Sequence, residues 1–315
     1  MPEPKPKRAD VTAVFLSMFS IYLFIGVGFL AKQVLREKLD ERTLVLLSIF
    51  FLQPFLNFWG LMQRPIDASL VLAPLVYTVV ILALLPLTYL LGKRLFADQK
   101  ERSIFIVSGL IGNTANLGIP VGIVIFGEAS IPYTTIINIA NVFFAYTVGV
   151  YFYSRGNFSI RESLMNIIKL PVLWSALAAI ICNLAGVTLH PAIDRILEMG
   201  AYASIVIQLI IFGVYLHSVQ IRTINLRLVA GVHATKFVML PLLTVLILTL
   251  VDLPPMVKGI LFMELIMPLA IANVNFASLY DCRPKDLTVL ILMTSVLFMG
   301  IVFAAIDLMN RFGWH

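Results

Sequence analysis

"GNTANLGIPVG", residues 112–122, is the most informative segment of the chain for its architecture. It lies inside an apolar run, yet it contains three glycines, two asparagines and one proline. Lipid offers no hydrogen-bond partners, so irregular backbone at membrane depth is tolerated only inside protein or beside a water-filled cavity. Pro120 lacks a backbone N–H and clashes with the carbonyl four residues back, so we expect it to break the helix and free the carbonyl of Asn116. This segment should therefore lie in the centre of the protein.

The composition of the whole chain indicates an integral membrane protein. Hydrophobic residues make up 60% of the 315 residues and charged residues only 13%, and the mean hydropathy is strongly positive. Only two cysteines are present, Cys182 and Cys282, so we expect neither a disulfide framework nor a metal site. No cofactor is expected. The chain has no HExxH motif and no nucleophile with a base at membrane depth, so an enzyme is not expected.

Ten apolar runs have about 20 residues each, the length that a helix needs to cross the hydrocarbon core. Backbone polar groups must pair within lipid, so spans joined by short polar loops are helices. The sequence predicts an all-α membrane protein with ten transmembrane helices. In chain order the expected spans are Val11 to Ala31, Thr43 to Met62, Ser69 to Gly92, Ser103 to Phe126, Ile131 to Tyr153, Ile167 to Leu189, Met199 to His217, Leu226 to Val251, Val257 to Tyr280 and Leu287 to Met309.

The positive charges indicate which side of the membrane each loop faces. Fifteen of the 23 Lys and Arg residues lie in loops that follow odd-numbered spans, seven lie on the other side, and Lys236 lies within the eighth span. Cytoplasmic loops carry the excess of Lys and Arg. We therefore expect a multi-pass protein of the inner (cytoplasmic) membrane with both termini on the non-cytoplasmic side. Anionic lipid headgroups explain the net charge of +6, so no nucleic-acid partner is expected.

A polar connector divides the spans into two sets of five, and an odd number of spans inverts the second set. Pro86 and Pro241, in the third and eighth spans, are 155 residues apart, and Pro120 and Pro268, in the fourth and ninth, are 148 apart. Inverted repeats with interrupted spans in matching positions are typical of secondary transporters whose site lies at the bilayer midplane. The expected division is residues 1–10 as a polar tail, 11–153 as the first five-helix repeat, 154–166 as a cytoplasmic connector and 167–310 as the second, inverted repeat.

The counterpart of the opening stretch is "ELIMPLAIANVN", residues 264–275, in which Glu264, Pro268 and Asn275 form a stripe. We expect the fourth and ninth spans to be broken and to cross each other. Half-helices that resume after a break present free N–H groups, which favour an anion, whereas freed carbonyls favour a cation. Glu264 and Lys236 lie at a similar depth. Glu264 is therefore expected either to carry a coupling ion or to form an ion pair with Lys236.

Three runs resemble the auxin efflux carrier family of membrane transporters: GNTANLGIP at residues 112–120, INIANVFFAYTVGVYFY at 137–153 and MPLAIANVNFASLYDCRPKDLTVLILMTSVL at 267–297. The resemblance covers nearly the whole chain. Because a long central loop is absent, the chain is similar to the short bacterial permeases for malonate, malate and related anions. The resemblance implies secondary active transport of a small organic anion, mono- or dicarboxylate, by alternating access. It also implies a site near the crossing and, as a further expectation, a homodimer.

The expected site combines residues of the fourth, fifth and ninth spans. Two alternatives stay open: a sodium-coupled organic anion symporter of the bile acid type, which has a similar inverted-repeat design, and a solute sensor that does not transport. Proton coupling, sodium coupling and uniport also stay open, as does the direction of transport. The expected substrate-binding residues are Asn113, Asn116, Gly118, Pro120, Asn138, Asn141, Met267, Pro268, Asn273 and Asn275, and those expected for the coupling ion are Glu264, Lys236 and Asn116.

Overall fold

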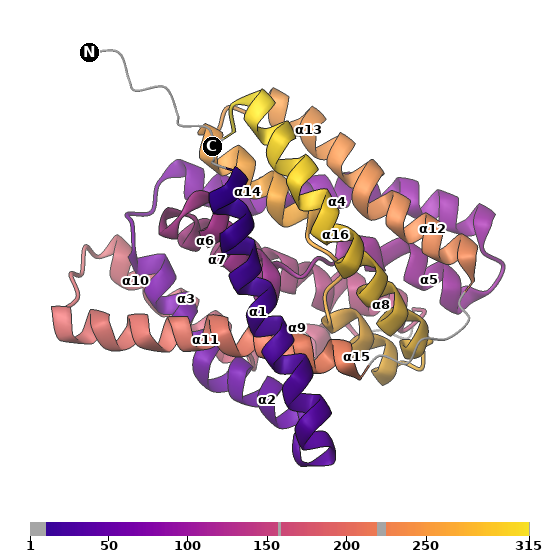
Figure 1. The fold of residues 1–315 in the computed structure, drawn as a ribbon. Helices are drawn as coiled ribbons and strands as arrows, with labels where there is room; N and C mark the ends of the chain where they lie inside the picture. Colours follow the sequence, from indigo (N-terminus) through magenta and orange to yellow (C-terminus); the bar gives the residue numbers. More distant parts are fainter. Residues whose placement is uncertain (1–10, 157–158, 219–224, 315) are drawn as a thin grey trace.

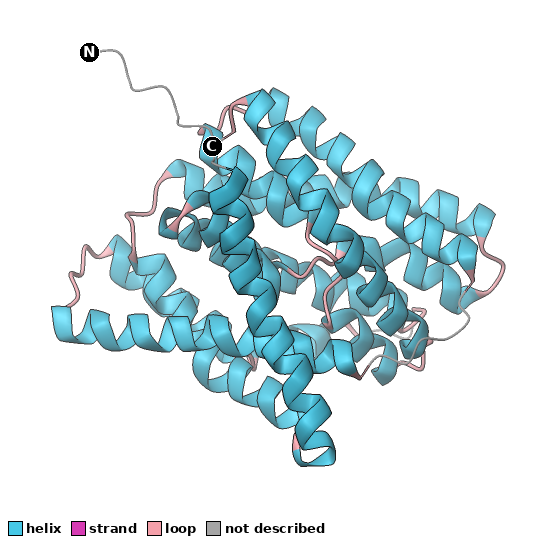
Figure 2. Ribbon diagram, viewed as in Figure 1, coloured by secondary structure: helices cyan, strands magenta, loops and turns pink. Residues whose placement is uncertain are grey.

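The computed structural model describes residues 11–156, 159–218 and 225–314, and helices make up its regular secondary structure (Figure 2). Within these ranges, β pairing is limited to one isolated antiparallel bridge between Gly112 and Leu269. The all-α fold class is therefore confirmed. The expected tail, residues 1–10, and residues 157–158 of the expected connector lie outside the described residues.

Short 3-10 and π-helical segments, labelled η, interrupt several of the α-helices (Figure 1). The α-helices are α1 (Val11–Leu35), α2 (Glu41–Leu47), α3 (Gln53–Met62), α4 (Ala68–Leu95), α5 (Gln99–Val107), α6 (Ile119–Phe126), α7 (Ile131–Phe144), α8 (Val150–Tyr153), α9 (Ile160–Ile168), α10 (Pro171–Leu184), α11 (Pro191–His217), α12 (Leu226–Ala234), α13 (Leu240–Leu250), α14 (Pro255–Ile266), α15 (Ala272–Leu279) and α16 (Pro284–Phe312). The other segments are η1 (Arg36–Lys38), η2 (Ser48–Leu52), η3 (Ser108–Leu110), η4 (Thr114–Gly118), η5 (Glu128–Ser130), η6 (Ala145–Gly149) and η7 (Thr235–Met239).

Polar caps and prolines set where many of these helices begin. Asp67 accepts a 2.8 Å hydrogen bond from the backbone N–H of Leu70 at the start of α4. Asp98 accepts one of the same length from the N–H of Glu101 at the start of α5. Each cap satisfies a donor that the first turn of a helix leaves free. Proline lies in the first turn of α7, α10, α14 and α16, where its missing N–H costs no hydrogen bond.

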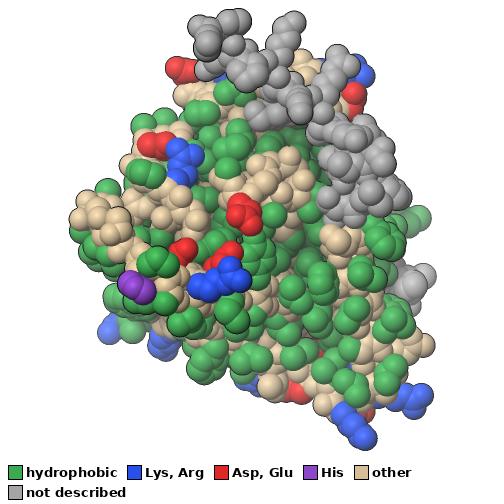
Figure 3. Space-filling view, turned by 60° about the vertical axis from the view of Figure 1, so that its left-hand side comes forward, with side chains coloured by type: hydrophobic (Ala, Val, Ile, Leu, Met, Phe, Trp, Pro, Cys, Tyr) green, Lys and Arg blue, Asp and Glu red, His purple; other side chains and the backbone are tan. Residues whose placement is uncertain are grey.

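Seven helical stretches in the described ranges are long and apolar enough to cross a bilayer, by length and composition. Large side chains on these helices face outward in rows: on α13, Leu242, Leu246 and Leu250 are 67%, 57% and 78% exposed. Figure 3 shows hydrophobic side chains over broad areas of one face. Lipid is the medium that covers such rows. The seven stretches are Phe19–Lys38, Glu41–Met62, Ala68–Leu95, Glu128–Tyr153, Pro191–His217, Leu226–Leu250 and Pro284–Phe312.

The expected sixth span, Ile167 to Leu189, is wrong in its limits, because α10 has only 14 residues. Pro171 starts the helix. Gly186 follows its end with a φ of 67°, and the N–H of Val187 donates a 2.9 Å hydrogen bond to the carbonyl of Cys182. This is the usual left-handed stop of a helix, which needs glycine at that position.

The helices pack in two groups. One contains α1, α3, α10 and α11, and the other contains α4, α5, α7, α13 and α14, with contacts between α3 and α7 and between α1 and α6 joining them. Glycines allow α1 and α11 to touch backbone to backbone. A Cβ atom on Gly213 would overlap the carbonyl of Ile25, and one on Gly28 would overlap the carbonyl of Ile210. Close approach through small residues is a common way for helices to associate in membranes.

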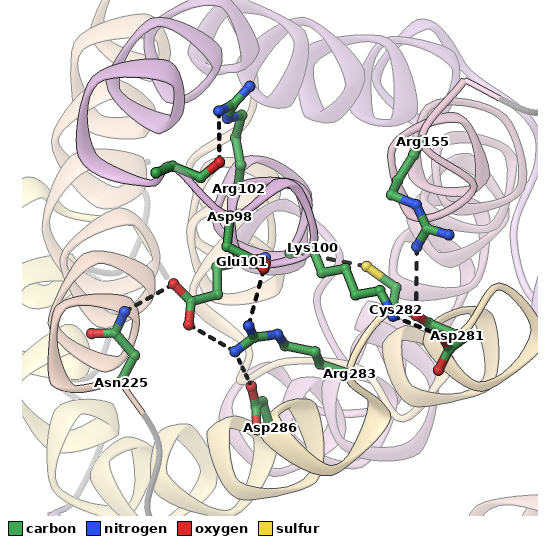
Figure 4. A network of polar contacts seen from close by, with 11 residues as sticks. Asp98, Lys100, Glu101, Arg102, Arg155, Asn225, Asp281, Cys282, Arg283 and Asp286 are labelled. Carbon is green, nitrogen blue, oxygen red and sulfur yellow. Dashed lines mark hydrogen bonds and ion pairs between the residues drawn. The ribbon is translucent and has the colours of Figure 1, made fainter.

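A network of charged groups surrounds Arg283, which directly precedes α16 (Figure 4). The guanidinium of Arg283 lies 2.8 Å from Glu101, 3.1 Å from Asp98 and 3.6 Å from Asp286. It therefore links the start of α5 to the start of α16. The start of α1 and the end of the described chain lie together at the opposite end of the molecule (Figure 1).

Candidate functional site

Two chain segments lose their helical winding in the centre of the molecule. The first lies between the end of η3 at Leu110 and the start of η4 at Thr114. The second lies between the end of α14 at Ile266 and the start of α15 at Ala272. They belong to the fourth and ninth expected spans, which the sequence singled out for their glycine, proline and asparagine content.

The two unwound segments pair with each other through their backbones. Asn113 donates its N–H to the carbonyl of Pro268 at 2.8 Å, and Ala270 donates its N–H to the carbonyl of Ile111 at 3.0 Å. These bonds flank the bridge between Gly112 and Leu269. Backbone groups that the broken helices leave free are thus satisfied inside the protein, as the low-dielectric interior requires.

The expectation that Pro120 marks the first break is wrong. Pro120 lies near the start of α6, which continues from the π-helical segment η4 without a break. The break precedes it, at Gly112, where an added Cβ would lie 3.1 Å from Nζ of Lys236. The absence of a side chain at Gly112 thus allows the backbone and Lys236 to come close together. Pro268, by contrast, does lie within the second break.

Asn141 of α7 holds the first break in place. Its Nδ2 donates to the carbonyl of Gly112 at 2.8 Å and to Oγ1 of Thr114 at 3.0 Å, and its Oδ1 accepts from the hydroxyl of Tyr77 at 3.1 Å. Thr114 in turn donates to Oδ1 of Asn138 at 2.8 Å. Both donor hydrogens of Asn141 are used within the protein, so this amide fixes the geometry of the site.

Asn273 of α15 has the same role at the second break. Its Nδ2 donates to the carbonyls of Ile111 and Ala270 at 3.2 and 3.0 Å. Its Oδ1 accepts a 2.7 Å hydrogen bond from the hydroxyl of Tyr153. The amide is fully buried, so its hydrogen bonds tie the two segments to each other. The tyrosines and Thr114 were missed by sequence reasoning, although buried tyrosine hydroxyls usually need a partner.

A cavity of about 910 Å³ lies beside the crossing. Its walls come from both broken segments and from α2, η2, α7, η6, α10, α11 and α15. The volume is in the range of small-molecule sites. Five of the expected site residues line the cavity, namely Asn113, Asn116, Asn138, Asn141 and Asn275, whereas Gly118, Pro120, Met267, Pro268 and Asn273 do not.

Three of the amides that line the cavity keep donors free. Nδ2 of Asn113 is buried and has no hydrogen-bond partner within the described part of the chain. Asn116 and Asn275 also make no side-chain hydrogen bond to the residues that the structure describes. A buried donor without a partner is costly, so Asn113 is suited to bind an acceptor that enters the cavity.

Glu264 and Lys236 lie outside the cavity lining, and each is only 1% exposed. A Cβ on Gly118 would overlap the carboxylate oxygens of Glu264, so Gly118 leaves room for this side chain. Both oxygens of Glu264 lack a hydrogen-bond partner among the described residues. Nζ of Lys236 lies beside Gly112 of the break, and Lys236 and Glu264 interact electrostatically without the direct ion pair that was expected.

Comparison with known proteins places the chain in a family of membrane proteins. A model of a family described as membrane transport protein matches residues 13–305, which include both broken segments. An uncharacterized transporter of Methanocaldococcus jannaschii is 27% identical over 234 residues, which are 72% of this chain and 73% of that protein. The resemblance that the three sequence runs carry is thereby confirmed.

Proposed function

The chain belongs to the membrane transport protein family, and from that premise we propose that it is a secondary active transporter of a small organic anion. The observation that carries the proposal is the unpartnered, buried amide of Asn113 at the wall of a cavity beside two crossing, unwound segments. An aqueous cavity in contact with broken helices is the usual site of such carriers.

The crossing favours a carboxylate over a cation at the cavity wall. The helical stretch Thr114–Phe126 begins at the break, and its first residues Ala115 and Asn116 line the cavity. The N–H groups in the first turn of a helix are free and carry partial positive charge, so they attract an anion. The carbonyls of Ile111 and Pro268, which would attract a cation, are already hydrogen-bonded. A mono- or dicarboxylate is therefore the proposed substrate class.

We propose that transport occurs by alternating access between two groups of packed helices. We assign ten spans in two inverted five-helix repeats, with α5 to α6 as the broken fourth span and α14 to α15 as the broken ninth. The group of helices that includes α4, α5, α7 and α14 would move relative to the group of α1, α3, α10 and α11. Such relative motion exposes a fixed site to each side in turn.

The cavity is proposed to face the cytoplasm. Glu41 and Arg42, at the start of α2, and Leu279, at the end of α15, lie in its lining, and the loops next to these helix ends are rich in Lys and Arg. Both termini would then lie on the other side of the inner membrane. We retain the homodimer as a proposal that rests on family membership alone.

Glu264 is the proposed carrier of a coupling ion. A buried carboxylate with both oxygens free is stable only with a proton, a bound cation or nearby positive charge. Lys236 is a nearby positive charge but makes no ion pair with Glu264, so the carboxylate oxygens stay free for a proton or a sodium ion. This observation favours coupling to a proton or sodium. The alternative function, a sodium-coupled symporter of the bile acid type, would also use such a coupling ion.

The function is tested by uptake into proteoliposomes. Labelled malonate, malate and indole acetate are supplied under separately imposed proton and sodium gradients. Saturable uptake and counterflow of at least one anion are expected, with a response to one gradient. Ion current without saturation would indicate a channel instead, and binding without flux would indicate a sensor.

Asn113→Ala is expected to lower uptake at least tenfold while the protein remains folded, because the variant removes a donor that has no partner in the empty protein. Asn57→Ala is the matched control, since Asn57 is equally buried but lies outside the cavity lining. Equal uptake by the Asn113 variant and the wild-type protein would overturn the site.

A further inference from the structure

The cavity has a second wall, formed in part by α11. Ile211, Val214 and Tyr215 of α11 all line the cavity, and their spacing of three and four residues places them on one face of the helix. Tyr215 is two residues from the end of α11 at His217. α11 also packs against η4, the segment that follows the first break, so both walls belong to one continuous site.

The hydroxyl of Tyr215 is buried and has no hydrogen-bond partner among the described residues. Buried tyrosine hydroxyls usually have one, and an unmade hydrogen bond of this kind destabilises the empty protein. Tyr215 therefore resembles Asn113: each residue lines the cavity and has a buried polar donor without a partner among the described residues. The two residues come from different elements and different walls.

Charges of both signs lie near Tyr215. Glu41 lines the same part of the cavity, but its carboxylate lies 3.4 Å from Nζ of Lys32 and accepts a hydrogen bond from Ser218. Arg42 also lines the cavity and forms no ion pair with the described residues. The lining at this wall thus carries one negative charge, Glu41 paired with Lys32, and one positive charge, Arg42 close to Asp40.

We propose that Tyr215 is a specificity-determining residue that donates its hydroxyl to a second acceptor on the transported anion. The first carboxylate binds at Asn113, and the second oxygen-bearing group lies at Tyr215. The inference rests on the proposed transport function and deepens it, because it selects anions with two polar ends over anions with one. The cavity volume of about 910 Å³ leaves room for such a substrate to extend between the walls.

The test compares Tyr215→Phe with Tyr22→Phe. Both variants remove a buried hydroxyl that has no partner, but Tyr22 lies outside the cavity lining. The probes are succinate and butyrate, two four-carbon acids that differ in the second carboxylate, and 4-hydroxybutyrate, whose second acceptor is neutral. Uptake of each labelled probe into proteoliposomes gives kcat/KM.

In the wild-type protein succinate is expected to be preferred over butyrate. Tyr215→Phe is expected to reduce that preference about tenfold, the usual effect of losing one hydrogen bond to a charged group. Tyr22→Phe is expected to leave it unchanged. The melting temperature of the empty Tyr215→Phe protein should not fall, because the removed hydroxyl makes no hydrogen bond in that state.

The outcomes separate the inference from the function on which it rests. If Tyr215→Phe loses only the preference for succinate over butyrate, the group bound at Tyr215 is a second carboxylate. If it also loses the preference for 4-hydroxybutyrate over butyrate, Tyr215 binds any oxygen acceptor. Both outcomes support the inference. An unchanged preference in Tyr215→Phe, or an equal change in Tyr22→Phe, overturns it while transport stands. If the wild-type protein neither takes up nor binds any of the probes, the proposed function and this inference are both overturned for four-carbon anions.

Discussion

The side-chain amide of Asn141 and the carbonyl of Gly112 are joined by a 2.8 Å hydrogen bond at the point where the first broken helix unwinds. The same amide also contacts Thr114 and Tyr77. One side chain of α7 thus satisfies the backbone of a segment that has left its helix. A carbonyl buried without such a partner would destabilise the crossing.

Asn141→Ala is expected to destabilise the protein by about 1–3 kcal/mol, because it leaves the carbonyl of Gly112 and the hydroxyl of Tyr77 without partners. Thermal unfolding in detergent measures the change. Asn116→Ala is the control, since the Asn116 side chain lines the cavity without a hydrogen bond. The control should unfold at the wild-type temperature and still lose uptake. Equal stability of the two variants would contradict the assignment of Asn141 as a structural clamp.

Gly213→Ala is expected to destabilise the α1–α11 contact by about 1–3 kcal/mol, the usual effect of forcing extra volume into a packed interface. The new Cβ would overlap the carbonyl of Ile25, which is backbone and cannot rotate away. Gly26→Ala on the same helix pair is the control, because a Cβ at Gly26 meets no atom within 4 Å. The control should be neutral or slightly stabilising, since alanine favours helix over glycine. Similar melting temperatures for the two variants would show that the contact is looser than described.

Glu264→Gln is expected to keep or raise stability while it removes the response of uptake to the coupling gradient. Glutamine has nearly the shape of glutamate but carries no buried charge, and an uncompensated charge in the interior is costly. The measurement is uptake with and without an imposed proton or sodium gradient, together with the melting temperature. Lys236→Met serves as a comparison, because it leaves the carboxylate buried without the nearby cation and should unfold at a lower temperature. Unaltered gradient dependence in Glu264→Gln would assign coupling elsewhere.

Asp98 makes the stability of the loop network sensitive to acid. The backbone N–H of Glu101, and after it the guanidinium of Arg283, hold the pKa of Asp98 below its ordinary value of 3.8. A lowered pKa in the folded state means that the carboxylate stabilises the protein above about pH 4 and that this contribution is lost as the pH falls through the folded-state pKa.

Asp98→Asn tests this effect, because asparagine still caps a helix but carries no charge. The variant should melt below the wild-type protein at pH 7, and the difference should shrink as the pH is lowered towards 3. Concentrated salt at pH 7 should also reduce the difference, since these groups are partly exposed and ions screen them. A difference that is constant with pH would show that the charge of Asp98 contributes nothing.

The sequence was sufficient to locate the crossing. Glycine, proline and asparagine at membrane depth identified both segments that unwind, because lipid excludes such backbone. The exact position of the first break could not be predicted from these residue types. The position of the break relative to Pro120 depends on where the first unwound segment pairs with the second. The second segment, around Pro268, is distant in the sequence. The length of α10 likewise depended on a glycine stop at Gly186.

The different roles of the asparagines could be assigned only from the structure. Asn141 and Asn273 look like Asn113 and Asn116 in the sequence, since all four are amides in apolar spans. The structure separates them by partner: the first two bond to the backbone of the breaks, and the last two keep free donors at the cavity. The close contacts that Gly28 and Gly213 allow between α1 and α11 could not be predicted either, because glycine is common in membrane helices.

The pairing of Gly112 with Leu269 joins two distant parts of the chain through main-chain atoms, which are the same in every amino acid. Side chains of the cavity wall that do not bond to this joint, such as Asn116, can therefore be exchanged without undoing it. A protein of this design is free to change its cargo by a few substitutions in the cavity wall, while the mechanical connection between the parts is inherited intact.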